Sequence, residues 1–319
     1  MDDPAALLKT KYNITAQSVS PVAGGFSAKA AYRVTGADST EYFVKVYDKS
    51  LPTTMSFVER VDLYMPVLDW LSASETLCGR VLTPVRAVEG KYKAETDCSV
   101  YVVFLFISGK VPGIEGISRS QTVELAEILA HLHDISGTVP FDKHLLAENT
   151  ALPFCENLSR YLAGAVTKKD KLSRLVSPHR DVLDKVICET LYLRGTIRRG
   201  YTPLVLCHGD AHGNNVIQGK RLVLADWEDL RRAPAEADLF IYAWHPHGDA
   251  LLEAYCAARD GYCINSELLR FYTLRRRLED IWVDIQRMTE ESPDDHEKEE
   301  LLGWINQSIQ AIVNGDGRV

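Results

Sequence analysis

The first hundred residues hold short apolar runs that turn residues separate. AAYRVTG (30–36) and EYFVKVYD (41–48) are rich in β-branched and aromatic residues, and the turn-forming stretch GADST joins them. This pattern predicts strands connected by a turn. Next comes TTMSFVERVDLYMPVLDWLSA (53–73), with apolar residues at helical spacing, and we expect Pro66 to kink or divide this helix.

A very apolar run, CSVYVVFLFISGKVPG (98–113), marks a change in character along the chain. It predicts a buried strand that leads into a linker at its glycine and proline residues. SRSQTVELAEILAHLHDIS then predicts an amphipathic helix, with Ser118 or Ser120 as its N-cap. Beyond it we expect mainly helices, interrupted by two short strands, LVLCH and RLVLAD. The sequence therefore predicts an α+β fold, with a β-rich lobe at 1–107 and a mainly helical lobe at 108–319.

Composition narrows the class of protein. The 319 residues are 46% hydrophobic and carry a formal net charge of -8. This charge argues against a nucleic-acid partner, which would require a basic surface. It suits a cationic small substrate, although many cytosolic proteins are mildly acidic without any such role. The seven scattered cysteines form no CxxC pair, so we expect reduced thiols and a cytoplasmic monomer. The acidic start and the lack of a run of about 18 apolar residues predict neither a signal peptide nor a membrane span.

One short stretch, 206–230, concentrates polar side chains between two apolar runs. It contains Asp210, Asn215 and, at the end of the second run, Asp226. Two carboxylates and an amide are the hard oxygen ligands that Mg²⁺ prefers, and one carboxylate can instead act on a substrate hydroxyl. The alternative is a polar hairpin loop without chemistry. Asp226 argues against it, because a charge at the end of a buried strand needs a partner.

The two histidines of this stretch, His208 and His212, suggest zinc at first sight. No third histidine or cysteine lies nearby at metal-ligand spacing, so a zinc site is not expected.

HGDAHGNN followed by LADWED resembles the catalytic loop and metal-binding aspartate of the aminoglycoside phosphotransferases and of the related choline, homoserine and methylthioribose kinases. Protein kinases use the same parts as H-R-D-x-x-x-x-N and D-F-G. RRAPAEADLFIYAW and FYTLRRRLEDIWVDI are similar to segments of spectinomycin-type aminoglycoside phosphotransferases. The resemblance implies a bilobal protein-kinase-like fold. It also implies Mg²⁺ and ATP, whose γ-phosphate is transferred to a hydroxyl of an aminoglycoside or aminocyclitol-like acceptor.

The resemblance assigns roles to individual residues. Asp210 would be the catalytic aspartate, and Asn215 and Asp226 would hold Mg²⁺. His208 and Asp238 would brace the catalytic loop. Four kinds of group are expected at the nucleotide: a lysine on a strand, its ion-pair partner on the following helix, a glycine loop and the hinge strand. In that order they are Lys45, Glu59, the loop residues Gly24, Gly25, Phe26 and Ser27, and the hinge residues Phe104 and Phe106. Asp62 is the second choice for the ion-pair partner.

An aminoglycoside carries several ammonium groups, so the resemblance directs attention to acidic residues for the acceptor. The candidates are Glu228, Asp229, Asp280 and Asp284. Asp280 and Asp284 lie one turn apart on one face of a predicted helix. They line an acceptor pocket, or they pair with the arginines at 275–277 on a solvated surface; the sequence leaves both readings open.

Two other functions compete with an antibiotic kinase. The first is a metabolic kinase of choline, homoserine or a sugar such as methylthioribose. The second is a catalytically silent, nucleotide-binding pseudokinase. The presence of Lys45, Asp210, Asn215 and Asp226 argues against the second, because a pseudokinase usually lacks at least one of these groups.

Overall fold

The structure, a computed structural model, describes residues 3–22, 30–142, 144–198, 202–243 and 245–315. The chain forms two compact units, Met1–Leu146 with His208–Arg231, and Ala147–Cys207 with Arg232–Val319. These bounds differ from the predicted lobes. The segment that carries Asp210 and Asp226 belongs to the unit of the N-terminal sheet, because its side chains and short strands pack there.

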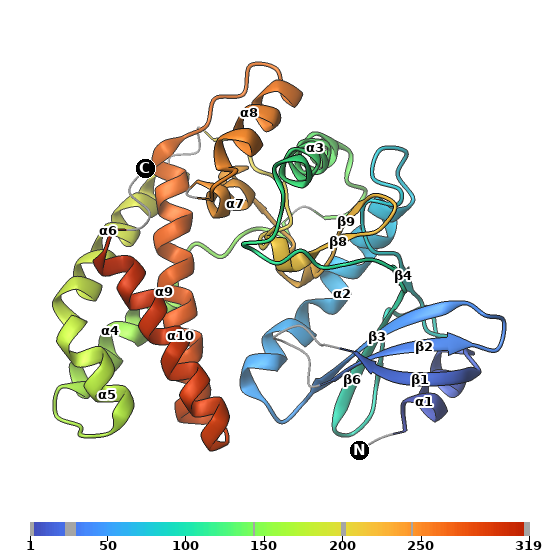
Figure 1. The fold of residues 1–319 in the computed structure, drawn as a ribbon, viewed down its shortest axis with the longest axis horizontal. Coiled ribbons are helices and arrows are strands. Elements are labelled where there is room, and N and C mark those ends of the chain that lie inside the picture. Colours follow the sequence, from blue (N-terminus) through green and yellow to red (C-terminus); the bar gives the residue numbers. More distant parts are fainter. Residues whose placement is uncertain (1–2, 23–29, 143, 199–201, 244, 316–319) are drawn as a thin grey trace. The chain divides into compact units, whose positions relative to one another are not determined.

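The first unit is built on an antiparallel sheet with the strand order β1-β2-β3-β6-β4, and β5 pairs with β6 (Figure 1). The predicted strands at 30–36 and 41–48 are confirmed as β2 and β3. The elements of this unit before the catalytic segment are α1 (Pro4–Tyr12), β1 (Ala16–Val22), β2 (Ala30–Gly36), β3 (Glu41–Asp48), α2 (Pro52–Ser72), β4 (Pro84–Val85), β5 (Lys93–Glu95), β6 (Ser99–Leu105), α3 (Arg119–Ile135) and η1 (Ser136–Thr138).

The two faces of the sheet serve different purposes. Val44 and Val46 join a buried apolar cluster to which α1 contributes Leu8. Because side chains alternate along a strand, Lys45 and Tyr47 point to the opposite face. Both are almost fully buried, with 5% and 0% of their surface exposed. The sheet thus presents a lysine and a tyrosine side by side on the face away from α1.

Helix α2 runs from Pro52 to Ser72 and is not divided at Pro66. Pro66 cannot donate to the carbonyl of Asp62, but Asp62 is exposed, so water can satisfy that group. Helix α3 begins as predicted. The Ser118 hydroxyl accepts a hydrogen bond from the Gln121 amide and forms a capping box with that residue.

The catalytic segment of the first unit forms a short hairpin flanked by two 3₁₀ turns. Its elements are η3 (Gly213–Asn215), β8 (Val216–Gln218), β9 (Leu222–Leu224) and η4 (Trp227–Asp229). The predicted strand RLVLAD is β9, but it pairs with β8, which the sequence pattern did not indicate. The predicted strand LVLCH is β7 (Val205–Cys207), and its partner is β10 (Arg231–Ala233).

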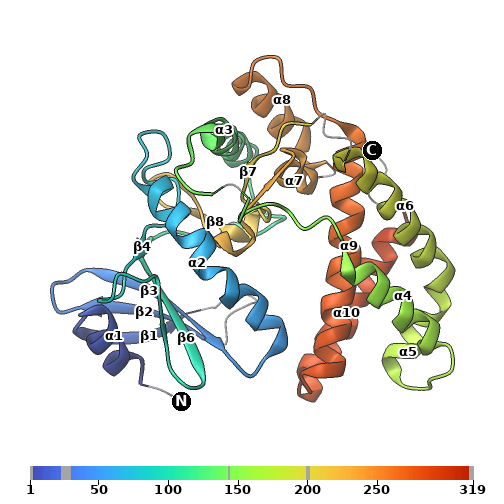
Figure 2. The same cartoon turned by 180° about the vertical axis from the view of Figure 1, so that it is seen from behind.

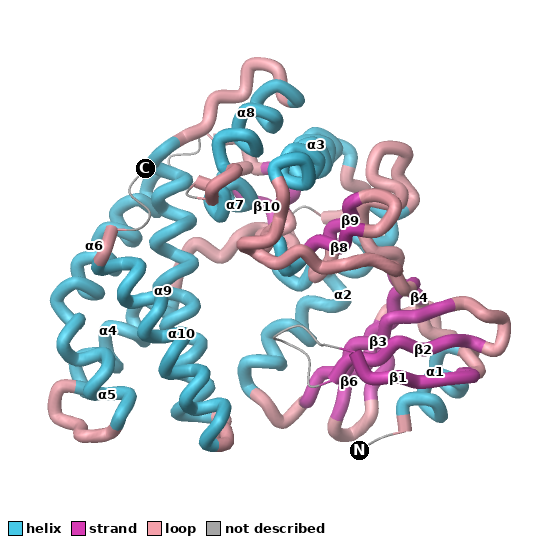
Figure 3. Tube along the Cα trace, viewed as in Figure 1, coloured by secondary structure: helices cyan, strands magenta, loops and turns pink. Residues whose placement is uncertain are grey.

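The second unit is mostly helical (Figure 3). The long helix α9 packs against α10, α6 and α4, as Figure 2 shows from behind. No helix in the described part of the chain is long and apolar enough to cross a bilayer. The remaining elements are α4 (Pro153–Ala165), α5 (Lys171–Val176), η2 (Ser177–His179), α6 (Arg180–Arg198), α7 (Glu236–Leu239), η5 (Phe240–Tyr242), α8 (Gly248–Ala258), α9 (Ser266–Glu290) and α10 (Asp295–Val313).

Gly209 fixes the path of the chain into the catalytic loop. Its φ of +85° lies in the left-handed region, which favours glycine. A Cβ atom at this position would lie 2.6 Å from the carbonyl oxygen of Asp229. Both the backbone conformation and the close approach to η4 therefore require glycine between His208 and Asp210.

We predict that Gly209→Ala destabilises the fold by about 1–3 kcal/mol from backbone strain alone, with the steric clash adding to this cost. Gly164→Ala is the matched control, since a Cβ atom there meets nothing within 4 Å. Because Gly164 lies within helix α4, that substitution should be neutral or stabilising by up to about 1 kcal/mol. Urea unfolding of the two variants and the wild type measures the difference. Equal midpoints for both variants would contradict the requirement for glycine at 209.

Candidate active site

The centre of the candidate site is the ammonium group of Lys45, which strand β3 delivers to two carboxylates. Lys45 Nζ lies 2.6 Å from Asp226 Oδ1 and 2.8 Å from Glu228 Oε1. Charge-assisted hydrogen bonds of this length are among the strongest in proteins, and all three groups are largely shielded from water. The buried Lys45 ammonium therefore pairs with two acidic side chains, Asp226 directly before η4 and Glu228 within it.

The protonation of Lys45 follows from this arrangement. Burial lowers the pKa of the Lys45 ammonium, because it disfavours the charged form. The negative charges of Glu228 and Asp226, together with their hydrogen bonds, outweigh burial and raise the pKa above its usual value. Lys45 therefore carries a fixed positive charge at every physiological pH.

Glu228 is held by more than Lys45. The Tyr47 hydroxyl donates a short hydrogen bond to the same Oε1 atom. From helix α2, Arg60 donates its Nε to the carbonyl oxygen of Glu228 at 3.1 Å and its Nη2 to that of Leu230 at 2.5 Å. The sequence reasoning missed Tyr47 and Arg60. The period of two along β3 could have indicated Tyr47, because it shares a face with Lys45.

The catalytic loop ties Asp210 to Asn215. The side-chain amide nitrogen of Asn215 donates to the backbone oxygen of Asp210 at 2.8 Å and to its Oδ2 at 2.9 Å. His212 Nε2 lies 3.4 Å from the same Oδ2. The amide nitrogen of Asn215 thus steadies the Asp210 carboxylate, while its amide oxygen remains the atom able to accept or to bind a cation.

His208 lies behind the loop and is fully buried. Its Nε2 is 2.8 Å from the carbonyl oxygen of Ala225, and its Nδ1 is 3.2 Å from the Asp210 amide nitrogen. A carbonyl accepts and an amide donates, which assigns the proton to Nε2 and the lone pair to Nδ1. The ring also meets Trp227 edge-on, with 4.6 Å between centroids. These contacts make His208 a brace between the loop and β9.

Asp226 adopts a left-handed backbone conformation, with a φ of 64°. A residue other than glycine pays about 1–3 kcal/mol for such strain, although aspartate tolerates it better than most. The bend turns the chain directly from β9 into η4. It lets Asp226 and Glu228, two residues apart, direct their carboxylates at the same ammonium group.

The oxygen donors at this site fit a magnesium ion. Asp226 and Glu228 supply carboxylate oxygens, and Asn215 supplies an amide oxygen, all hard ligands. The Ala225 amide donates to the Asn215 backbone oxygen at 2.8 Å, which keeps Asn215 and the segment that contains Asp226 adjacent. No soft or nitrogen ligand enters this set, so its chemistry favours Mg²⁺ over zinc.

Glu59, the expected ion-pair partner of Lys45, does not fill that role. Its side chain is exposed on α2, whereas the next residue, Arg60, points inward to η4. The second candidate, Asp62, pairs with Lys93 at 3.0 Å. Successive helical residues point about 100° apart, so Arg60 and not Glu59 lies on the face of α2 that reaches the site. The acidic partners of Lys45 are Asp226 and Glu228 instead.

Of the predicted nucleotide loop and hinge strand, only the hinge strand belongs to the residues that the structure describes. Gly24, Gly25, Phe26 and Ser27 lie outside the described residues. Phe104 is buried in β6, and the Phe106 amide donates to the Glu41 carbonyl oxygen at 2.9 Å. A nucleotide contact through the Phe106 amide would have to displace that bond.

The four acids expected at the acceptor have different surroundings. The Glu228 carboxylate is buried against Lys45 and Tyr47, so its charge is already neutralised locally. Asp229 lies 3.8 Å from Arg231. Asp280 pairs with Arg276 at 2.9 Å, one turn away on α9, as the solvated-surface alternative anticipated.

Asp284 differs from the other three. It is 5% exposed, and no ion pair or hydrogen bond joins it to another described residue. Burial raises the pKa of its carboxyl to about 7; the charge of Asp280 adds to the rise and Arg287 opposes it. This carboxylate therefore changes its charge close to neutral pH.

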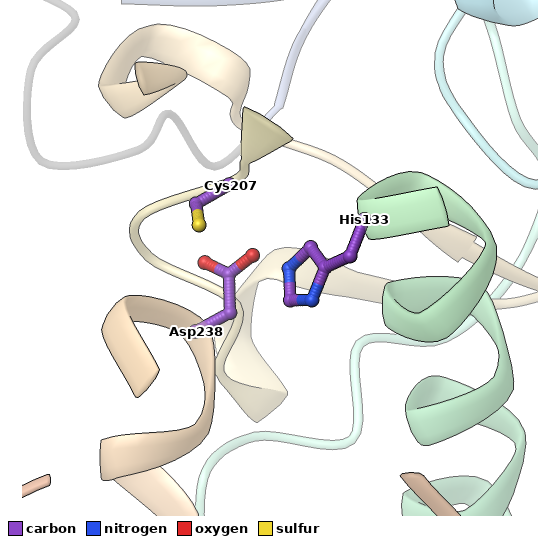
Figure 4. Close-up of side chains that lie close together, drawn as sticks. All are labelled: His133, Cys207 and Asp238. Carbon is purple, nitrogen blue, oxygen red and sulfur yellow. The ribbon is translucent and has the colours of Figure 1, made fainter. Parts of the chain in front are cut away.

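Asp238, expected to be structural, is fully buried in α7. In the second unit its carboxylate lies beside the Cys207 thiol at the end of β7 (Figure 4). Cys207 Sγ also donates to the carbonyl oxygen of Pro234 at 3.4 Å, which ties β7 to the start of α7. His133, also labelled in Figure 4, belongs to the first unit.

Comparisons with known proteins show which solved structures this chain resembles in fold. The structure resembles that of spectinomycin phosphotransferase in complex with ADP and spectinomycin, with a TM-score of 0.75, 17% identity and 98% of each chain covered. It also resembles the ethanolamine kinase of Plasmodium vivax, with a TM-score of 0.62, 15% identity, and 93% of this chain and 82% of that one covered. An aminoglycoside-3'-phosphotransferase of type VIII gives 0.55 and 20% identity, covering 82% of this chain and 93% of that one.

At identities this low, the structural similarity shows a shared fold and nothing more. The comparison with curated protein sequences gave no match. The sequence itself establishes the family, because residues 18–272 match the model of a family described as "Phosphotransferase enzyme family". Since that match runs from the sheet through the H-G-D loop and into α9, the chain belongs to this family of phosphotransferases.

Proposed function

We propose that the protein transfers the γ-phosphate of ATP to a hydroxyl group of a small cationic acceptor of the aminoglycoside or aminocyclitol type. Family membership makes it a phosphotransferase; the proposal concerns the donor, the acceptor and the residues. The observation that carries it is the contact of Lys45 with Asp226 and Glu228, beside the Asp210–Asn215 pair. These are the parts that phosphoryl transfer requires: a fixed cation, oxygen ligands and a carboxylate able to accept a proton.

Four residues would bind the nucleotide or its metal: Lys45, Asn215, Asp226 and Glu228. The Lys45 ammonium would act as a point charge on the phosphates. The three oxygen ligands would hold Mg²⁺, which neutralises charge on the phosphates when it is bound. ATP as donor is supported by the spectinomycin enzyme, solved with ADP, and by an amicoumacin kinase, solved with AMP-PNP. A kanamycin complex of another relative contains GDP, so the choice of purine needs a direct test.

Asp210 would act on the acceptor. Its carboxylate would accept the proton of the attacking hydroxyl, and Asn215 would keep it in place through the bond at 2.9 Å. Its side chain is 19% exposed, so a substrate can reach it. The acceptor oxygen would form a bond to the γ-phosphorus of ATP as the bond between that phosphorus and the bridging oxygen of the leaving ADP breaks. The hydroxyl proton would pass to Asp210.

Asp210→Asn should retain the fold and nucleotide binding and lower kcat by about 10²–10⁴-fold, because asparagine cannot accept the proton. Asp97→Asn, at an exposed site in the same unit, is the control and should leave turnover unchanged. ADP release and a thermal melt measure both properties. Wild-type turnover in Asp210→Asn would show that the base lies elsewhere.

The acceptor class rests on charge and on the relatives. Spectinomycin, kanamycin and ethanolamine, named with three of the similar structures, all carry amino groups. The ethanolamine kinase also supports the alternative of a metabolic kinase acting on choline, homoserine or a sugar such as methylthioribose. A panel of aminoglycosides, spectinomycin, choline, ethanolamine, homoserine and methylthioribose, assayed for ADP release, decides between these. Mg²⁺-dependent ATP binding without turnover on any acceptor would favour a pseudokinase. A cytoplasmic monomer and a role in antibiotic resistance are further parts of this proposal.

Within the second unit, Asp284 is the acid we assign to the acceptor. At pH 6 most of its carboxyl is protonated, and at pH 8 most is ionised, because its pKa is about 7. If the ionised form binds an acceptor ammonium, the acceptor KM should fall about tenfold from pH 6 to pH 8. The raised pKa also means that ionising Asp284 costs folding stability as pH rises from about 4 to 7.

Asp284→Asn should therefore raise the acceptor KM at pH 8, flatten its pH dependence, and leave the KM for ATP unchanged. It should also raise the melting temperature at pH 8, since the buried charge is removed. Asp181→Asn, exposed on α6, is the control. An unchanged pH profile of the acceptor KM in Asp284→Asn, with the expected gain in stability, would confine Asp284 to a structural role.

A further inference from the structure

The Tyr47 phenol is a fully buried polar group that the proposed chemistry does not use. It is 0% exposed, and its hydroxyl donates to Glu228 Oε1. The same oxygen accepts a hydrogen bond from Lys45 Nζ at 2.8 Å. One carboxylate oxygen of Glu228 is thus held by two donors that come from alternate positions of a single strand.

These two donors differ in what they can do during a reaction cycle. The Lys45 ammonium is charged and would turn toward the phosphates of a bound nucleotide. The Tyr47 hydroxyl already donates to Glu228 Oε1. The rigid ring of this strand residue keeps the donor in one place.

Helix α2 also contributes side chains that support the contact between Tyr47 and Glu228. Tyr64 of α2 is 1% exposed, and its side chain forms a hydrogen bond with that of Tyr47. Arg60 fixes the main chain of Glu228 through its carbonyl oxygen. The backbone and the side chain of Glu228 are consequently anchored by different donors.

We infer that Tyr47 is a positioning residue that holds the Glu228 carboxylate beside Asp226 when the Lys45 ammonium engages nucleotide phosphates. Without the Tyr47 hydroxyl, Glu228 Oε1 would lose one of its two donors, and the carboxylate would be held less firmly as a ligand for the metal. The inference rests on the proposed function, because it presumes that Glu228 and Asp226 share a cation. The alternative is a purely structural role for Tyr47, in packing the buried core.

The test compares ADP affinity with and without Mg²⁺ in the wild type and in Tyr47→Phe. Partners that orient a metal ligand typically change metal affinity or activity by about 10–100-fold. We expect Tyr47→Phe to reduce the Mg²⁺-dependent gain in ADP affinity by about tenfold or more, and to leave metal-free ADP affinity unchanged. Calorimetric titration gives both values without any phosphoryl transfer.

Tyr12→Phe is the matched control. Tyr12 is a buried tyrosine of the same unit whose hydroxyl donates to the Tyr101 carbonyl oxygen at 3.0 Å, away from Glu228. It should lose stability without any change in the Mg²⁺ effect. In a Glu228→Gln background, Tyr47→Phe should change the Mg²⁺ effect no further, because the ligand that it positions is already altered.

The outcomes separate the inference from the proposed function. If wild-type ADP binding shows no Mg²⁺ effect, the proposed function fails and the inference falls with it. If the wild type shows the effect and Tyr47→Phe keeps it in full, the inference alone is overturned. Should Tyr47→Phe not fold, Tyr64→Phe, one tyrosine further from the metal ligands, replaces it. A smaller loss of the Mg²⁺ effect there supports the inference, and no loss overturns it.

Discussion

A single buried ammonium group, that of Lys45, holds the candidate site together. Asp226 and Glu228 stand two residues apart on a strained turn, and their charges would repel in a largely dry environment if no cation lay between them. The lysine removes that repulsion and links strand β3 to η4. In the proposed function, this contact would provide the fixed charge for phosphate and two of the oxygen ligands for a metal.

Much of the first unit could be predicted from local signals. Strands β2 and β3 coincide with the β-branched and aromatic runs, and the Ser118 capping box marks the start of α3. Asp210 and Asp226 stood out because the H-G-D loop and the D-W-E turn resemble phosphotransferase motifs, and the same resemblance pointed to Lys45 on its strand. These signals succeed because each depends on neighbours in the chain, through strand alternation, capping and loop chemistry.

What could not be predicted depends on contacts distant in sequence. Whether Glu59 or Arg60 faces the site is decided by the rotation of α2, and one residue along a helix turns the side chain by about 100°. Likewise, Asp280 and Asp284 share a helical face, yet one pairs with Arg276 near solvent while the other is buried. The packing around α9 creates that difference, and spacing along one helix contains no information about it.

The most direct measurement is the stability of Lys45→Met with and without Mg²⁺. Removing one partner from a buried ion pair typically costs about 3–5 kcal/mol, and a cation that binds the carboxylates of Asp226 and Glu228 in place of the lysine should restore part of it. We predict a large fall in melting temperature that millimolar Mg²⁺ partly reverses, with a shift larger than in the wild type and absent when Glu228→Gln is added. An unchanged melting temperature in Lys45→Met, or an equal Mg²⁺ shift in all three proteins, would contradict the account.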